Sequence, residues 1–96
     1  MKAKIYVVLE DYDNGESYEE WYSANRTFVA VAGTEDTARQ AIQDVILEMQ
    51  KDDWYDDPGK ISEDHERGRI VFERPSGCHV EKSEFYWIEK EVEIPD

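Results

Sequence analysis

The sequence predicts an α+β fold of order ββαββ, in which an antiparallel sheet packs a single helix on one face. Three observations support this prediction: one helix-period segment in the middle of the chain, strand-like runs on both sides of it, and turn residues between them. The 96 residues predict a single domain, residues 1–96. With 40% apolar and 12% aromatic residues, the chain is too apolar for a disordered acidic tail.

The first half of the chain predicts a β-hairpin. Residues 4–12 are rich in β-branched side chains and form the first predicted strand. Asn14-Gly15 then favours a two-residue type I′ turn, after which a second strand begins near Ser17. Residues 27–32 either continue this second strand past a bulge near Asn25 or form a separate strand.

A two-residue turn would fix the register of this hairpin. Val8 would face Trp21, and Glu10 would face Glu19 directly across the ladder. Like charges in that arrangement destabilise a hairpin, whereas a longer loop removes the clash. A conflict of this kind is expected where a surface serves a function.

The middle of the chain predicts an amphipathic helix from Glu35 to about Lys51. Thr34 is the expected N-cap, and acidic residues occupy the first turn, where the helix dipole favours them. Apolar residues recur at three- and four-residue spacing, which is typical of a helix packed on a sheet. These are Ala38, Ala41, Ile42, Val45, Ile46 and Met49.

The last third of the chain predicts two more strands. Residues 61–68 are polar and favour a loop, residues 69–74 a strand, and residues 78–82 a loop or a short strand. Residues 84–94 form the final predicted strand. Period-two alternation puts Tyr86, Ile88, Val92 and Ile94 on one of its faces and Glu89, Glu91 and Glu93 on the other.

The chain is strongly acidic, since 24 Asp and Glu against 11 Lys and Arg give a net charge of −13. A compact domain of this length has a diameter of about 32 Å, and duplex DNA of that length carries about 19 phosphates. The charge is thus roughly two thirds of that on DNA. Such a field disfavours direct binding to nucleic acid and favours a basic surface on another protein. The alternative is that the acidity serves solubility alone.

Four segments together resemble small ββαββ proteins encoded by phages and prophages. They are the Lys4-Ile-Tyr-Val-Val opening, the acidic hairpin, the Gly33-Thr-Glu-Asp-Thr-Ala helix start, and the ending from Phe85-Tyr-Trp-Ile-Glu to Val92-Glu-Ile. This pattern covers most of the chain. The resemblance implies a class in which some small acidic members inhibit host defence nucleases, including anti-CRISPR proteins that imitate DNA. It carries over no functional residue.

These arguments favour a non-enzymatic binding module that blocks a basic, nucleic-acid-binding surface of a target protein, such as a host defence nuclease. Three acidic groups are expected to bind that partner: the hairpin, the segment after the helix with its two aromatic residues, and a row on the last strand. Their residues are Glu10, Asp11, Asp13, Glu16, Glu19, Glu20, Asp52, Asp53, Trp54, Tyr55, Asp56, Asp57, Glu89, Glu91 and Glu93. An edge-strand homodimer that is acidic only for solubility is the alternative, and a small enzyme is the third candidate.

Trp54 and Tyr55 lie among four aspartates, and two roles fit them. Aromatic rings surrounded by acid are suited to holding Arg or Lys through stacking and charge. A loop tryptophan can equally cap the open end of a core.

The sequence predicts no metal site, cofactor or catalytic residue. An EF-hand loop with Gly15 at its sixth position would put Tyr12 at a ligand position and Trp21 where the bidentate glutamate is required. Cys78 and His79 are adjacent, so along a strand they point to opposite faces, which opposes a zinc site and a Cys-His pair. The sequence has neither an apolar run of about 18 residues nor a signal peptide, so no membrane contact is expected and the cytoplasm is the expected location.

Overall fold

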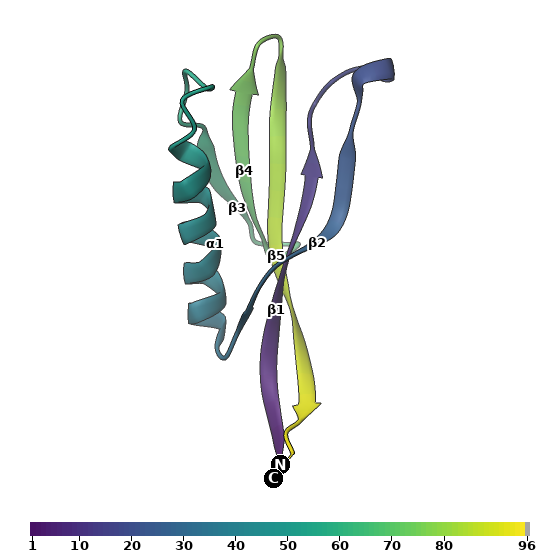
Figure 1. Cartoon of the computed structure of the whole chain (residues 1–96), viewed down its shortest axis with the longest axis vertical. Coiled ribbons are helices and arrows are strands. Elements are labelled where there is room, and N and C mark those ends of the chain that lie inside the picture. Colours follow the sequence, from purple (N-terminus) through teal and green to yellow (C-terminus); the bar gives the residue numbers. More distant parts are fainter. Residues whose placement is uncertain (96) are drawn as a thin grey trace.

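The structure is a computed structural model that describes residues 1–95. Its strands are β1 (Lys2–Asp13), β2 (Ser23–Ala32), β3 (Lys60–Asp64), β4 (Arg69–Ser76) and β5 (His79–Glu93); the helix α1 is Glu35–Gln50, and a 3-10 turn, η1, spans Tyr18–Glu20. The strands form one antiparallel sheet in the order β2-β1-β5-β4-β3, and α1 lies against it (Figure 1). The predicted α+β class, with one helix on one face of an antiparallel sheet, is confirmed.

β3 is a strand where the sequence predicts a loop. The prediction for residues 61–68 is wrong in its first part, because β3 pairs with β4 through Ile61 and Phe72. β3 is a five-residue edge strand, and an edge strand needs little apolar side-chain surface, so its polar composition concealed it. β5 likewise begins at His79 rather than at Glu84, since its first residues pair with β4.

The connection between β1 and β2 is longer than a two-residue turn. β2 begins at Ser23, Val8 pairs with Ala30 and Glu10 pairs with Thr27, so the expected pairing of Glu10 with Glu19 is wrong. The alternative in which one strand continues past a bulge near Asn25 is confirmed, because the register shifts there. Arg26 adopts a positive φ of 57° at this bulge.

Asn14 explains why the loop is long. Its Oδ1 accepts hydrogen bonds from the backbone N–H groups of Glu16 and Tyr22, and its Nδ2 donates to the carbonyl of Glu20. The asparagine thus holds a wide loop together from within, instead of occupying a tight turn. Gly15, at φ +72°, lies against β5, and a Cβ there would come within 2.0 Å of the Val80 carbonyl oxygen. The loop therefore packs on the start of β5.

The core lies between α1 and one face of the sheet. Thr34 caps α1 in a capping box with Thr37, as the sequence predicts for the N-cap. The helix buries Ala38, Ile42 and Ile46 completely or almost completely, and half-buries Val45 and Met49. The sheet contributes buried side chains to the same cluster: Val8, Ala32, Ile70, Phe72 and Phe85.

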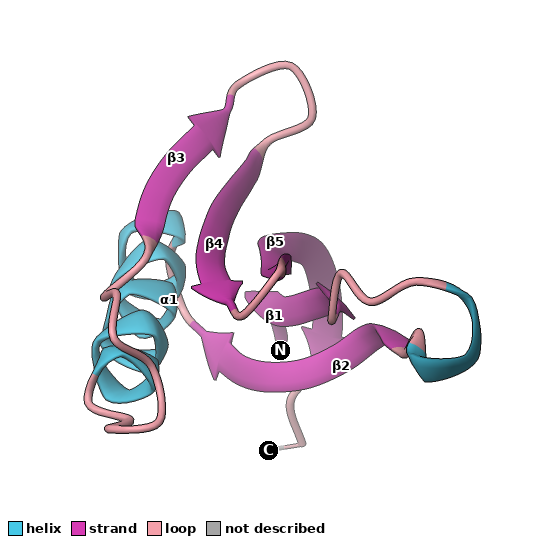
Figure 2. Cartoon of the chain, turned by 90° about the horizontal axis from the view of Figure 1, so that it is seen from above, coloured by secondary structure: helices cyan, strands magenta, loops and turns pink. Residues whose placement is uncertain are grey.

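The two faces of β5 differ in what covers them. Fully buried Phe85 and half-buried Trp87 belong to the α1 core, and the residues between them face the other side of the sheet. That other face is covered by no helix in the described part of the chain (Figure 2).

The molecule is elongated, with extents of 53 × 26 × 26 Å and a Cα radius of gyration of 15.3 Å. β1 and β5 extend beyond the rest of the sheet toward the two termini, while two long connections and the short β4–β5 turn lie at the opposite end (Figure 1). Duplex DNA of this length carries about 31 phosphates, so the net charge of −13 is about two fifths of that on DNA. The earlier expectation of two thirds is too high, and the distribution of the charge becomes the deciding property.

Candidate binding surface

Three connections meet at one end of the sheet, which we call the loop end: residues 13–22, residues 51–59 and residues 76–79 (Figure 1). The first of these segments rests on the third. Gly15 lies against Val80, and Glu16 approaches His79, with 3.1 Å between the carboxylate and Nδ1. The first loop is therefore packed against the β4–β5 turn and the start of β5.

A half-buried polar network fastens the loop end to the sheet and to α1. Tyr12 at the base of the first loop donates to Glu81 at 2.9 Å, and Tyr55 of the second loop donates to the other oxygen of the same carboxylate. Arg74, 7% exposed, stacks 3.5 Å from the centroid of the Tyr55 ring and donates at 2.6 Å to the carbonyl of Met49 in the last turn of α1.

The network has two electrostatic consequences. Burial, and then the neighbouring Glu81 carboxylate, raise the pKa of both Tyr12 and Tyr55 above the ordinary tyrosine value, so both phenols stay protonated. The Nε of Arg74 is buried without a hydrogen-bond partner, while its other nitrogens reach Met49 and, at 3.8 Å, Glu81. This arginine links the end of α1 to the second loop.

The loop end concentrates the negative charge of the chain. Its 23 residues contain eight carboxylates against Lys51 alone, which is a formal −7 of the total −13. Lys51 pairs with Glu48, and His79 lies beside Glu16, so neither neutralises the rest. Among the described residues, seven of these carboxylates form no ion pair. They are Asp13, Glu19, Glu20, Asp52, Asp53, Asp56 and Asp57.

Four of the seven leave both oxygens open to a partner, and three do not. Asp13 accepts from the backbone N–H of Gly15 and from Trp21 Nε1, Asp52 accepts from the N–H of Trp54, and Asp57 accepts from the N–H of Gly59. These three shape their loops, while still contributing negative charge. The remaining carboxylates make no hydrogen bond within the described chain: Glu19, Glu20, Asp53 and Asp56.

Exposed aromatic rings accompany the carboxylates. Trp54 is 81% exposed and Tyr18 is 94% exposed, and Trp21 and Tyr22 are more than half exposed. Trp54 and Tyr55 differ in their surroundings. Trp54 faces solvent, whereas the Tyr55 ring stacks against the guanidinium group of Arg74. The sequence analysis did not predict Tyr18, Trp21 and Tyr22 at this surface, because it assigned the residues from about Ser17 onward to a strand, whereas β2 begins at Ser23.

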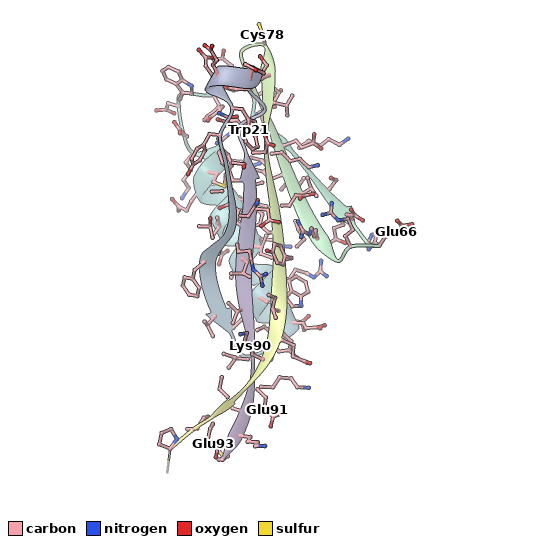
Figure 3. All side chains as sticks on the ribbon, turned by 90° about the vertical axis from the view of Figure 1, so that its right-hand side faces the viewer. Trp21, Glu66, Cys78, Lys90, Glu91 and Glu93 are labelled. Atoms are coloured by element: carbon pink, nitrogen blue, oxygen red, sulfur yellow. The ribbon has the colours of Figure 1, made fainter. Side chains whose placement is uncertain are left out.

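The row of glutamates on β5 lies at the other end of the molecule, which we call the terminal end (Figure 3). Each carboxylate there has a cationic partner: Glu89 with Lys4 at 3.2 Å, Glu91 with Lys2 at 3.6 Å, and Glu93 with the N-terminal amine at 3.3 Å. The sequence prediction that this row extends the acidic surface of the hairpin is therefore wrong in its geometry. The structure brings the first two acidic groups together and leaves the third apart.

Asp11 belongs to neither end. It lies on the sheet face opposite α1, where it accepts from the Arg26 backbone, from Arg69 and from Tyr86 at 2.9 to 3.2 Å. Burial opposes its ionisation, but these three hydrogen bonds lower the pKa of Asp11 overall. Arg69 also pairs with Glu84 at 2.9 Å. Asp11 is thus part of an internal ion-pair cluster, and Glu10 is half-buried within β1.

The metal-ligating side chains and the cysteine can be placed directly in the structure. Within residues 1–95, no group of three or more His, Cys, Asp and Glu side chains is arranged to hold a metal ion. Cys78 is exposed at the β4–β5 turn (Figure 3). In the same residues, no helix has the length and apolar character needed to cross a membrane.

Searches for related proteins do not add to this geometry. No protein-family model, no curated protein and no solved structure matches the chain. Any inference about function therefore rests on the geometry and surface chemistry of the chain itself.

Proposed function

We propose that this protein is a non-enzymatic binding module whose loop end docks on a basic, nucleic-acid-binding surface of a target protein and blocks it. The observation that supports the proposal is the combination at one end of seven carboxylates without ion pairs and four exposed aromatic rings. Carboxylates accept charge-assisted hydrogen bonds from Arg and Lys, and aromatic faces stack on guanidinium groups. A surface with both is matched to an arginine-rich groove.

The way the loops are fastened supports binding over solubility alone. Association costs free energy when loops must be ordered, and a prearranged surface avoids much of that cost. Tyr12, Tyr55 and Arg74 hold two loops on one platform, and Gly15 packs on β5. Charge that served solubility alone would need no such platform.

The phage-type inhibitors that the sequence resembles use the same principle, which is negative charge presented to a nucleic-acid-binding protein. The proposal narrows where that charge acts in this chain. Glu19, Glu20, Asp53 and Asp56 contact the target directly, and Trp54 and Tyr18 stack on its cationic side chains. The row Glu89, Glu91 and Glu93 does not take part, because its charges are already paired.

The test compares two variants with the same change in charge at opposite ends. The loop-end triple is Glu19→Gln, Glu20→Gln and Asp53→Asn; the row triple is Glu89→Gln, Glu91→Gln and Glu93→Gln. Wild type is used to capture a target from host lysate at low salt, and the affinity of that purified target is then measured for all three proteins. We expect the loop-end triple to bind about tenfold more weakly, mainly through slower association, and the row triple to bind like wild type.

Two further outcomes bear on the proposal. Nucleic acid added to the complex should compete with the protein for the target, and affinity should fall steeply as salt rises. Equal weakening by both triples would mean that net charge, rather than the loop end, attracts the target. A complex that is insensitive to salt and to nucleic acid would contradict the proposal.

A further inference from the structure

The outer edge of β2 is the least acidic part of this acidic protein. Residues 21–34 contain no Asp or Glu, and within β2 itself Arg26 is the only charged residue. The chain otherwise carries an acidic residue on average every four positions, with 24 in 96. A ten-residue strand without a carboxylate therefore stands out on this surface.

The two edges of the sheet are protected to different degrees. β3, at one edge, has five residues, and three of them are charged: Lys60, Glu63 and Asp64. Short length and charge are the usual means by which edge strands avoid pairing with another chain. β2, at the other edge, has ten residues and only one charge, and no described element lies beyond it (Figure 2). Register shifts against β1 interrupt β2 near Asn25 and near Val29, so the outward backbone groups that are open to a partner strand form short stretches separated by these bulges.

Apolar side chains border this open edge on the sheet face that α1 leaves uncovered. Phe28 is 63% exposed and Val31 is 55% exposed. They pair in register with Leu9 and Val7 of β1, and Val7 pairs in turn with Ile88 of β5, so the apolar surface continues across three strands. Burying it would gain free energy in proportion to its area.

We propose that a second copy of this chain occupies the β2 edge, so that two β2 strands pair antiparallel across a two-fold axis. The two sheets then form one continuous sheet, and Phe28 and Val31 of each copy pack beside those of the other. A strand paired antiparallel with itself is the arrangement that two-fold symmetry requires.

The charges along β2 favour this occupant over others. A basic partner strand would find no carboxylate on β2, and an acidic one would find only Arg26. Two β2 strands meet without any pair of opposed carboxylates in every register. The charged and short β3 edge stops further growth, so the assembly closes as a dimer.

Dimer formation and target binding should respond to salt in opposite directions. The dimer brings together two chains of net charge −13, so screening by salt strengthens it. Target binding pairs opposite charges, so salt weakens it. The dimer proposal therefore does not depend on the proposed function, and failure of one leaves the other intact.

The experiment is sedimentation of the full chain over a range of concentrations at low and high salt. The test variant is Phe28→Lys, and the control is Leu47→Lys, which makes the same charge change at a 57% exposed position on α1. Both substitutions change the net charge of the chain by the same amount, so a difference between them reports where the lysine is placed. We expect wild type and the control to reach twice the 11.3 kDa chain mass. The dissociation constant of the Phe28→Lys dimer should be at least about tenfold higher than that of wild type.

Amide hydrogen exchange provides the second measurement. β2 amides of wild type should exchange more slowly as concentration and salt rise, while β3 amides should not change. A mass of 11.3 kDa at every concentration and salt, polymers larger than a dimer, or equal behaviour of the two lysine variants would overturn the proposal. Melting curves of both variants verify that each remains folded.

Discussion

The loop end and the terminal end of this sheet are both rich in acid, yet they differ in what surrounds each carboxylate. At the terminal end, Glu89, Glu91 and Glu93 lie beside Lys4, Lys2 and the N-terminal amine. At the loop end, seven carboxylates have no cationic neighbour among the described residues. The density of acidic residues in a sequence is thus a poor guide to a binding surface, because a fold can neutralise one acidic row and leave another free.

The largest expected difference between the two ends is in the stability lost when a cationic side chain is removed from each. Arg74→Ala should cost about 3 kcal/mol of unfolding free energy, because it leaves Glu81 without its buried cation and removes the stacking under Tyr55. Lys4→Ala at the terminal end removes an exposed pair and should change the melting temperature far less. Chemical denaturation of both variants measures this. Comparable losses of unfolding free energy in the two variants would mean that Arg74 does not stabilise the loop end more than an exposed ion pair stabilises the terminal end.

The next difference concerns alkaline pH. The pKa values of Tyr12 and Tyr55 are raised by burial and by Glu81, so in the folded chain both phenols keep their protons above the unfolded value of 10.0. A raised pKa of this kind contributes stability that is complete below pH 10.0 and is lost as pH rises above it.

Replacing these tyrosines tests the sign of that dependence. Tyr12→Phe or Tyr55→Phe should each cost about 1 kcal/mol at neutral pH by removing a hydrogen bond to Glu81. The double variant should also lose less stability than wild type between neutral pH and alkaline pH. Tyr18→Phe, at a 94% exposed position whose phenol makes no hydrogen bond within the described residues, is the control. If all three variants followed the wild-type pH curve, the network would not be holding the loops.

The smallest expected difference is in thermal stability after neutralising each end. The loop-end triple, Glu19→Gln, Glu20→Gln and Asp53→Asn, removes mutual repulsion and should raise the melting temperature by a few degrees at most, or leave it unchanged. The row triple removes three ion pairs and should lower it slightly. Calorimetry at low salt gives the clearest reading. If the melting temperature changed in the same direction in both triple variants, the proposed difference between the two ends would be wrong.

Much of the fold follows from local patterns in the sequence. The helix was predicted from Glu35 to about Lys51 and is observed over Glu35–Gln50, because its apolar period and its Thr34 cap act within a few residues. The strands β1, β4 and the second half of β5 were predicted for the same reason. β3 was missed because it is held by backbone pairing with β4 and has few apolar side chains to mark it.

The candidate site was predicted only in part. The acidic segments around residues 13–20 and 52–57 are evident in the sequence, and the structure brings them to one end. The wide loop was missed because Asn14 uses its side chain to hold backbone groups of the loop as far as Tyr22, whereas the Asn-Gly pattern is typical of a tight turn. With the loop assigned to a strand that begins near Ser17, Trp21 was expected to face Val8 across the hairpin instead of being an exposed ring.

The sequence by itself determined the class of the fold, the position of its helix and the excess of negative charge, since these depend on composition and on short-range periodicity. Only the tertiary structure decided which of the carboxylates remain free. Glu91 is neutralised by Lys2, which lies at the other end of the chain, because β1 and β5 are neighbours in the sheet. Asp53 lies in the exposed loop between α1 and β3 and forms no ion pair in the described part of the chain. Ion pairing acts over a few ångströms in space, and distance along the chain does not predict it.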